Sequence, residues 1–309
     1  MQARSLAAAV AGAMILAGAS APPTRAQDTL RVCLDEKLPP FSVRHGREGG
    51  GFDFAVADVV AKRLGKTLAV QWFESKVDTD SSTTLAANAL LSDGRCQLVG
   101  GYPLIKDALG KPGAETGRMP DYDGATLADR RRRVALGALV PSKPYHYAPL
   151  TVVLAPGVTR PITRLADLED LKLAVEAATL ADAILMTYGD GRLVNRITHL
   201  VPGRGELLPR LEQGGFDATL IPLHRFDAYR AEHPQTVLKP SGYYHRIGFN
   251  MGFVGLSTEA ALIEQVSAAL GDMLAGGELP SLAQAAGMTY VPPRQPEVRD
   301  SLSLADLHE

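Results

Sequence analysis

The stretch "LRVCLDEKLPPFSV", residues 30–43, places charged and aromatic side chains directly after an apolar run. The run ends at Asp35 and Glu36, and two prolines then lead to Phe41. Proline has a fixed backbone dihedral and no amide donor to satisfy, so the pair predicts a rigid corner. The pattern therefore predicts a strand that ends abruptly and presents acidic and aromatic groups to whatever lies beyond it.

The sequence lacks the common motifs of metal sites, nucleophilic enzymes and nucleotide-binding sites. The chain has 7 histidines, and no two of them are four residues apart, the spacing of a helical metal site. There is also no G-x-S-x-G nucleophile motif, no P-loop and no G-x-G-x-x-G fingerprint. We therefore expect a non-catalytic protein without a metal or a cofactor.

The composition indicates a soluble protein with a sizeable core. The chain has 309 residues, of which 46% are hydrophobic and 21% charged, and its net charge is −2. A charge so close to zero creates no general attraction for nucleic acid or an anionic membrane. The single Trp gives no sign of a surface on which bases could stack.

The first residues have a different character from the rest. Arg4 is followed by an apolar or small run at residues 5–21, which is typical of a secretory signal peptide. We expect a signal peptide at residues 1–26 with cleavage after Ala26, although an uncleaved membrane anchor is an alternative. No later segment approaches about 18 apolar residues, so we expect the mature protein to be free in the periplasm or outside the cell.

Two cysteines, Cys33 and Cys96, follow the expected cleavage site. In an oxidising compartment an isolated pair is a candidate disulfide, which would be worth about 4 kcal/mol in the chain-entropy model. The alternative is two buried thiols that behave as small hydrophobic side chains.

Apolar strands alternate with amphipathic helices in the first half of the chain. The β-α-β-α-β order predicts a parallel sheet with helices on both faces. The expected strands are 29–34, 68–73 and 96–101, and the expected helices are 51–66 and 83–94. One face of the first helix is apolar and consists of Phe52, Val56, Val59, Val60 and Leu64.

The same pattern begins again in the second half. The expected strands are 171–176, 196–201 and 216–221, and the expected helices are 179–189 and 206–215. A join at 142–157 and a return crossing at 245–256 would connect the two halves. In the final helix, Ser257 is a candidate cap, and the apolar stripe is Leu262, Val266, Leu270 and Met273. We expect one lobe from 27–150 with 250–309, and a second from 151–249.

Two segments do not fit this plan. Residues 105–126 are rich in Gly and Asp and have no period, which indicates either disorder or a functional lid or partner-binding loop. The tail at 292–309 is polar, and we expect it to be loosely held.

In this order the segments resemble the family 3 periplasmic solute-binding proteins, the receptors of ABC-type importers. The resemblance covers about residues 29–288. Its carriers are "LRVCLDEKLPPFSV", "GGGFDFAVADVVAKRLG", "ALLSDGRCQLVGG", "SKPYHYAPLTVV", "LADLEDLKLAVEAATLADAI", "LLPRLEQGGFDATLI" and "LGDMLAGGELPSLAQAAGM". The family implies a periplasmic binding protein-like α/β fold, with two lobes of parallel-rich sheets, two crossing strands and a ligand held between the lobes.

The resemblance also implies where a ligand would bind. Asp35, Glu36 and Phe41 would form one wall of the cleft, although Phe41 could instead fill the core of its own lobe. The remaining candidates are Tyr102, Arg130, Ser142, Tyr145, Thr179 and Pro222. Arg130 belongs to a run of four arginines that could simply be solvated, and the two tyrosines could cover the hinge. Thr179 matches the small turn at which the family binds a carboxylate.

One departure from the family pattern affects the expected ligand. Amino-acid receptors commonly have an acid where this chain has Pro222, and without it the ammonium group of an amino acid would be poorly paired. We therefore expect a small polar or organic-acid ligand, a monomeric receptor and an ABC permease as its partner.

Two alternatives remain. The paired cysteines and the Gly-x-Pro at Tyr102 resemble a subgroup encoded with quinoprotein alcohol dehydrogenases, which implies an accessory factor for a periplasmic PQQ-dependent dehydrogenase. The chain lacks the Trp-Gly-Pro that often ends the second-lobe strand in that subgroup. The second alternative is an enzyme like the cyclohexadienyl dehydratases, because a few family 3-like periplasmic proteins are such enzymes. Its candidate general acids would be Glu36, Glu74 and His224.

Overall fold

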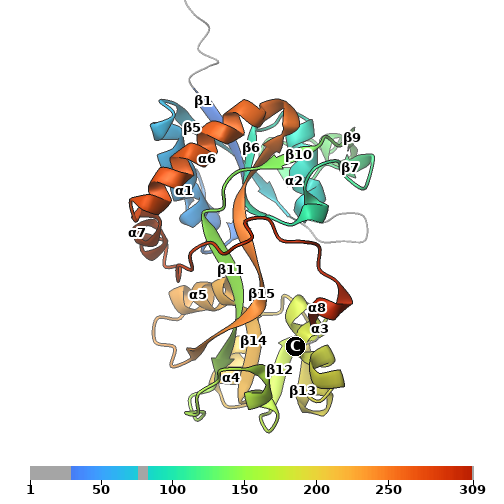
Figure 1. The fold of residues 1–309 in the computed structure, drawn as a ribbon, viewed down its shortest axis with the longest axis vertical. Coiled ribbons are helices and arrows are strands. Elements are labelled where there is room, and N and C mark those ends of the chain that lie inside the picture. Colours follow the sequence, from blue (N-terminus) through green and yellow to red (C-terminus); the bar gives the residue numbers. More distant parts are fainter. Residues whose placement is uncertain (1–28, 76–82, 308–309) are drawn as a thin grey trace, which may run out of the picture.

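The computed structural model describes residues 29–75 and 83–307, so the expected signal peptide at 1–26 lies outside the described residues. Two lobes meet along two long strands, β11 (His146–Leu154) and β15 (Lys239–Leu256), which run through both lobes (Figure 1). These two strands pair in antiparallel fashion. The predicted architecture of two α/β lobes joined by two crossing strands is confirmed.

A single 10-stranded sheet runs through the molecule. Its order is β13-β12-β14-β11-β15-β6-β1-β5-β8, and β10 pairs with β15 beside this path. In the second lobe the strands are β12 (Leu173–Glu176), β13 (Ile197–Leu200) and β14 (Ala218–Pro222). In the first lobe they are β1 (Thr29–Asp35), β5 (Thr67–Glu74), β6 (Leu98–Pro103), β8 (Asp121–Tyr122) and β10 (Leu139–Pro141).

The first lobe packs helices on both sides of its strands. These helices are α1 (Phe52–Arg63), α2 (Thr83–Ser92), α6 (Ala260–Ala275) and α7 (Glu278–Ala285). In α1 the predicted apolar face is present: Phe52, Val56 and Val60 are fully buried, and the other two members pack at the margin of the core. A small sheet of β2 (Lys37–Leu38), β3 (Ser42–His45) and β4 (Glu48–Gly50) adjoins α1.

Gly51 allows α1 to begin close to the corner that contains Phe41. Its φ of 98° lies in the region that favours glycine. A Cβ at this position would lie 2.5 Å from the carbonyl oxygen of Phe41. The amide of Asp53 donates to that same oxygen at 2.7 Å, so the helix start and the corner form one unit.

The second lobe has its own apolar clusters around β12 and β14. Its helices are α3 (Leu180–Thr187), α4 (Leu207–Glu212) and α5 (Leu223–Glu232). Short helices η4 (Leu165–Leu168), η5 (Tyr188–Asp190) and η6 (Val194–Arg196) complete it. Ile184, Leu185 and Leu220 are fully buried, as expected where a helix covers parallel strands.

The predicted cap of the final long helix, Ser257, is wrong by two residues. Residues Ser257–Glu259 form a short helix, η7, and Glu259 precedes α6 without a side-chain cap. Val266, Leu270 and Met273 are buried as the apolar stripe predicted, and Leu262 packs at the edge of the core.

The aperiodic segment at 105–126 contains short elements that hold it to the first lobe. With the residues that follow it, the segment forms η2 (Lys106–Ala108), β7 (Thr116–Arg118), β8, η3 (Asp129–Arg131) and β9 (Arg133–Ala135). Strand β8 pairs with the end of β5, and β7 pairs with β9. We call residues 105–135 the inserted segment.

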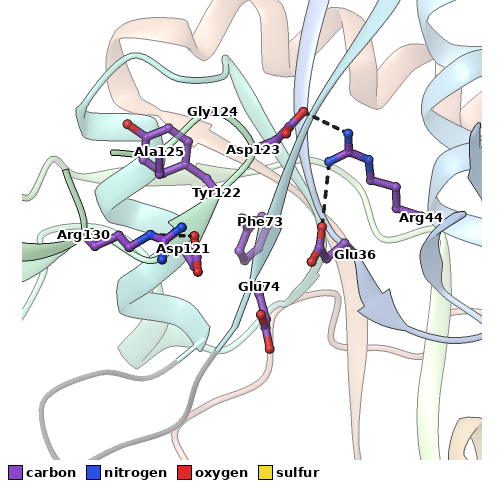
Figure 2. Close-up of a pocket in the computed structure, with 10 residues that line it drawn as sticks. All are labelled: Glu36, Arg44, Phe73, Glu74, Asp121, Tyr122, Asp123, Gly124, Ala125 and Arg130. Carbon is purple, nitrogen blue, oxygen red and sulfur yellow. Dashed lines mark ion pairs between the residues drawn. The ribbon is translucent and has the colours of Figure 1, made fainter. Parts of the chain in front are cut away.

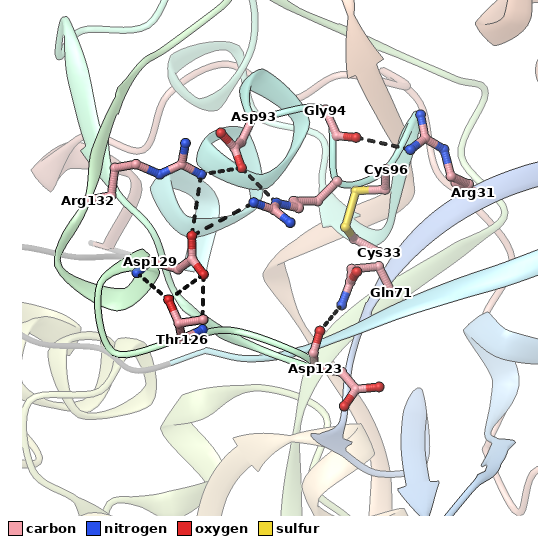
Figure 3. Close-up of polar contacts among 11 residues, drawn as sticks. Arg31, Cys33, Gln71, Asp93, Gly94, Cys96, Asp123, Thr126, Asp129 and Arg132 are labelled. Carbon is pink, nitrogen blue, oxygen red and sulfur yellow. Dashed lines mark hydrogen bonds and ion pairs between the residues drawn. A yellow bond between two sulfur atoms is a disulfide. The ribbon is translucent and has the colours of Figure 1, made fainter.

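Ion pairs and the predicted disulfide surround the base of the inserted segment (Figure 3). The Cys33–Cys96 bond is present, with an S–S distance of 2.04 Å, and links β1 to the turn two residues before β6. Asp93 accepts from Arg95 at 2.7 Å and from Arg132 at 2.5 Å. Both arginines also approach Asp129, at 3.9 and 4.0 Å. The inserted segment is therefore anchored to the turn that precedes β6.

The tail is not loosely held, contrary to the expectation from its polarity. It leaves α7, crosses β11 and β15, and ends as α8 (Leu304–Leu307) against α3 of the second lobe (Figure 1). Across the two described ranges, no helix combines the length and apolar character needed to cross a bilayer.

Candidate functional site

The direction of the strands brings two sets of strand ends to face each other. Strand β6 is antiparallel to β15, which enters the first lobe from the second, so β6, β1 and β5 point their carboxyl ends toward the second lobe. Strand β14 is antiparallel to β11, so β14 and β12 point theirs toward the first lobe. Ligands of open α/β sheets bind beyond the carboxyl ends of strands, which here means between the lobes.

A pocket of about 240 Å³ lies at the carboxyl ends of β1 and β5, and we call it the edge pocket (Figure 2). Its lining combines the strand ends with the inserted segment. The lining residues are Glu36, Arg44, Phe73, Glu74, Asp121, Tyr122, Asp123, Gly124, Ala125 and Arg130. Of the residues predicted to bind ligand, Glu36 and Arg130 are therefore brought together.

Charge in the edge pocket is arranged in pairs. Arg44 contacts Asp123 at 3.1 Å and Glu36 at 3.9 Å, and Arg130 contacts Asp121 at 3.1 Å. At the rim, the hydrogen bond from Lys37 to Glu74 raises the pKa of that lysine. Carboxylates can accept from hydroxyl or ammonium groups, and the two arginines can donate to a carboxylate. The pocket is thus suited to a polar ligand.

Asp35 lies beside the edge pocket and stabilises the turn that follows β1. Its carboxylate accepts from the amide of Lys37 at 2.9 Å and from the amide of Ser75 at 3.2 Å. The hydroxyl of Ser75 also donates to it. These bonds fix the ends of β1 and β5 relative to each other and so position Glu36.

The candidate residues of the second lobe lie at the ends of β12 and β14. Thr179 caps α3: its hydroxyl accepts from the amide of Asp182 at 3.2 Å and donates to the carbonyl of Glu176 at 2.8 Å. Pro222 ends β14 and directly precedes α5. Neither residue lines the edge pocket.

Three further residues near Thr179 were not among the candidates from the sequence: Ala178 before α3, Asp182 in its first turn and His199 on β13. Ala178 has a φ of 59°, a left-handed conformation that costs a residue other than glycine about 1–3 kcal/mol. Its amide donates to Asp182 at 2.8 Å, and Asp182 also contacts Nε2 of His199 at 2.9 Å. The sequence signal was slight, because Asp182 and His199 are 17 residues apart and no local pattern joins them.

Phe41 lies where the two lobes touch. Its ring is 3% exposed and belongs to the first-lobe core. It also packs 5.0 Å from His146 on β11 and 4.6 Å from His224 at the start of α5. A cavity of only about 10 Å³ remains beside these three rings, and we call it the hinge cavity.

The two histidines at the hinge cavity are neutral at pH 7. Burial lowers the pKa of His146 to about 3 and that of His224 to about 4. Nε2 of His146 and Nδ1 of His224 have no hydrogen-bond partner among residues 29–75 and 83–307. Nε2 of His146 lies 3.9 Å from Oδ1 of the buried Asp53, so the lobes meet on neutral rings beside a buried carboxyl group.

Tyr145 holds a buried carboxyl group of the first lobe. Its hydroxyl donates to Asp53 at 2.9 Å and accepts from the amide of Gly101 at 2.7 Å. Burial raises the pKa of Asp53 to about 7, although the bond from Tyr145 acts in the opposite direction. Asp53 was missed by the sequence reasoning because nothing in "GFDF" distinguishes a buried acid from an exposed one.

Tyr102 and Ser142 are engaged within the first lobe. The hydroxyl of Tyr102 donates to the carbonyl of Ala108 at 2.7 Å, and burial raises its pKa above the usual range. The hydroxyl of Ser142 accepts from the amide of Phe253 at 2.9 Å and so joins the end of β10 to β15.

The three candidate acids for a dehydratase do not share one pocket. Glu36 and Glu74 line the edge pocket, whereas His224 lines the hinge cavity. The described residues also contain no group of three or more His, Cys, Asp or Glu side chains placed to hold a metal ion.

Comparison with solved structures identifies the fold. The L-cystine solute receptor of Neisseria gonorrhoeae, in its unliganded open conformation, matches with a TM-score of 0.60 and 18% identity over 86% of this chain and 95% of that one. The second substrate binding domain of a putative amino acid ABC transporter from Streptococcus pneumoniae Canada MDR_19A matches with a TM-score of 0.58 and 16% identity over 82% and 98%.

Substrate binding domain 2 of GlnP from Lactococcus lactis, in its open conformation, is similar to the same degree. Its TM-score is 0.57 at 16% identity over 84% of this chain and 96% of that one. No family model matches the sequence, and no curated protein matches it. These likenesses show a periplasmic binding protein-like fold.

Proposed function

We propose that this chain is an exported receptor that captures a small polar or organic-acid ligand between its lobes for an ABC-type importer. One observation carries the proposal: the carboxyl ends of two parallel strand sets face each other across two crossing strands. Such an arrangement lets both lobes contact one ligand and close on it by a hinge motion.

The edge pocket is the first-lobe part of the proposed binding site. Glu36 and Arg130 line it, and the start of α3 with Thr179 is the second-lobe part. Pro222 offers no charge to an ammonium group, which argues against an ordinary amino acid. The names of the neighbours, which include receptors for L-cystine and other amino acids, support capture of a solute of similar size.

The disulfide supports export to an oxidising compartment, and we propose the periplasm. Cys33 and Cys96 are both buried and bonded to each other. Disulfides persist in the bacterial periplasm and are rare in the cytosol. The proposed signal peptide at residues 1–26 would direct the chain there.

A ligand screen tests the proposal. The chain from Gln27 onward is heated with amino acids, sugars, organic acids or PQQ, and hits are measured by calorimetry. A ligand at a hundredfold excess over its Kd should stabilise the protein by about 2.7 kcal/mol. Stabilisation by none of these classes, with the fold intact, would refute the receptor function.

Variants then test the edge pocket itself. For any hit, Glu36→Gln and Arg130→Ala should weaken binding at least tenfold, because each removes one charged lining group. Arg133→Ala is the matched control, since this exposed arginine lies in the same run but outside the pocket. Binding that both pocket variants leave unchanged would place the ligand elsewhere between the lobes.

The second candidate function, an accessory factor for a PQQ-dependent dehydrogenase, is favoured by one observation. Arg130 to Arg133 are all exposed on the inserted segment, and among them Arg130 and Arg132 pair with carboxylates. A surface of this kind suits contact with an acidic protein. Co-purification with a periplasmic quinoprotein dehydrogenase that is lost in the Arg131→Ala/Arg133→Ala variant would support this function. Dehydrogenase activity that is unchanged when this chain is absent would count against it.

A further inference from the structure

The C-terminal segment forms a third connection between the lobes. After α7 the chain crosses the hinge, contacts the first lobe again and ends on the second lobe (Figure 1). We propose that residues 300–307, the C-terminal latch, restrain the rotation of the second lobe against the first. This inference does not depend on the identity or existence of a ligand.

The segment before the latch is fixed to the hinge strands. Nδ2 of Asn250 on β15, which carries two hydrogens, lies within hydrogen-bond distance of the carbonyls of Arg294, Pro296 and Glu297, at 2.6, 3.1 and 3.0 Å. Its Oδ1 accepts from the amide of Arg294 at 2.9 Å. The guanidinium of Arg294 also lies 4.3 Å from the centre of the Tyr147 ring on β11. One buried amide side chain thus holds three residues of the segment.

The same segment is fixed to the first lobe at Arg299. The amide of Arg299 donates to the carbonyl of Leu104 at 2.9 Å, and the amide of Lys106 donates to the carbonyl of Arg299 at 3.0 Å. Val298 packs against the apolar cluster around α2 and β6. Residue 299 therefore moves with the first lobe.

The latch itself is fixed to the second lobe. Leu302 and Leu307 pack against the apolar cluster that includes Ile184 and Leu185 of α3. Oγ1 of Thr187, the last residue of α3, lies 3.2 Å from the carbonyl oxygen of Leu307, and the same hydroxyl also contacts the carbonyl of Ala183 at 2.7 Å. Arg246 on β15 donates to the carbonyl of Asp306 at 2.6 Å. The latch therefore docks on the helix whose other end carries Thr179.

The latch restrains the rotation of the lobes because its two attachment points, at Arg299 and at Leu302, are close together along the chain. Arg299 belongs to the first lobe and Leu302 to the second, and three residues of extended chain span at most about 11 Å. A rotation that separates the two attachment points further must break the contacts of one anchor. We infer that the docked latch narrows the range of lobe orientations.

Distance measurements between the lobes test the latch. Lys62→Cys on α1 and Glu232→Cys at the end of α5 provide one exposed labelling site in each lobe. The native cysteines are bonded to each other, so only the new thiols react with a spin label. The distribution of label distances is recorded for the full chain and for a chain that ends at Arg299.

We expect the chain that ends at Arg299 to show a broader distribution, with a second population above about 10% that is rare in the full chain. Leu302→Ser/Leu307→Ser keeps the backbone and should broaden the distribution in the same way. Leu127→Ser is the matched control, because Leu127 is 65% exposed and lies in the first lobe. If the shortened chain does not fold, the double variant decides. A distribution in the double variant that matches the control would overturn the proposal.

Discussion

Asp53 is a carboxyl group whose protonation state is set by burial. Its pKa of about 7 exceeds the usual value of 3.8, so the folded state binds a proton more tightly than the unfolded chain does. The contribution of Asp53 to the free energy of unfolding is therefore fully present below about pH 4 and is lost as the pH rises toward 7. The loss could reach roughly 4 kcal/mol, at about 1.4 kcal/mol for each unit of pKa shift.

Asp53→Asn should remove this pH dependence, because the amide stays neutral and can still accept from Tyr145. We expect the free energy of unfolding of the variant, relative to the native chain, to increase between pH 4 and pH 8. Urea unfolding of both proteins at several pH values measures this difference in the free energy of unfolding. Asp58→Asn, at a more exposed position of the same helix, is the control. A difference that does not vary with pH would show that Asp53 ionises normally.

His146 makes the stability of the fold depend on pH in the opposite direction. Its pKa of about 3 lies below the usual 6.5, so the unfolded chain binds the proton more tightly. The stability it contributes is present above about pH 6.5 and is lost as the pH falls toward 3. Because Asp53 and His146 act in opposite directions between about pH 4 and 6.5, their effects partly cancel in the native chain.

His146→Phe should therefore make the protein more resistant to acid than the native chain. The phenyl ring can fill the space between Phe41 and Phe52 and cannot be protonated. We expect its stability relative to the native chain to improve by about 1.4 kcal/mol for each pH unit below 6.5. Denaturant unfolding at pH 7 and pH 4.5 measures this. His45→Phe, which changes an exposed histidine, is the control.

At the scale of elements, the disulfide connects β1 to the turn in front of β6. The bonded cysteines are 63 residues apart in sequence. In the chain-entropy model a loop of this size is worth about 4 kcal/mol. The same turn carries Asp93, which pairs with two arginines of the first lobe, so the bond also supports the base of the inserted segment.

Cys33→Ser/Cys96→Ser should lower the free energy of unfolding by about 4 kcal/mol, since the unfolded chain regains its loop entropy. Guanidinium unfolding with and without a reductant measures the loss. The reductant should destabilise the native chain and leave the double variant unchanged. A native chain that is insensitive to complete reduction, verified by thiol counting, would contradict the prediction.

The regular elements could be predicted from the sequence because each carries a local signal. The apolar runs at β1 and β5 and the apolar face of α1 indicate buried strands and a covering helix without knowledge of distant residues. Strands of two or three residues, such as β8 and β7, are too short for any period to show. The docking of the tail depends on Asn250 and on α3, both far away in the sequence, so its polarity alone was misleading.

The candidate site was predictable only in part, for the same reason. Glu36 follows an apolar run, and strand ends converge, so its place at a pocket could be expected. The pairing of Tyr145 with Asp53 joins residues 92 positions apart, and the contact of Phe41 with His224 joins the two lobes. Neither has a local signature, because both depend on how the elements fold together.

At the scale of the whole molecule, the two lobes share one sheet. Strands β11 and β15 pair with β14 on one side and with β6 on the other. Neither lobe can unfold without exposing the backbone groups of strands on which the other depends. We expect a single thermal transition in which the calorimetric and van't Hoff enthalpies agree. Two resolved transitions would show that the lobes are energetically independent.

The shared strands also limit how the gene could be divided. A fragment that ends after β10 would leave β6 without its neighbour β15, and a fragment limited to 155–238 would leave β14 without β11. Each would present a long unsatisfied strand edge, which in water promotes aggregation. Each half therefore needs the crossing strands to complete its part of the sheet.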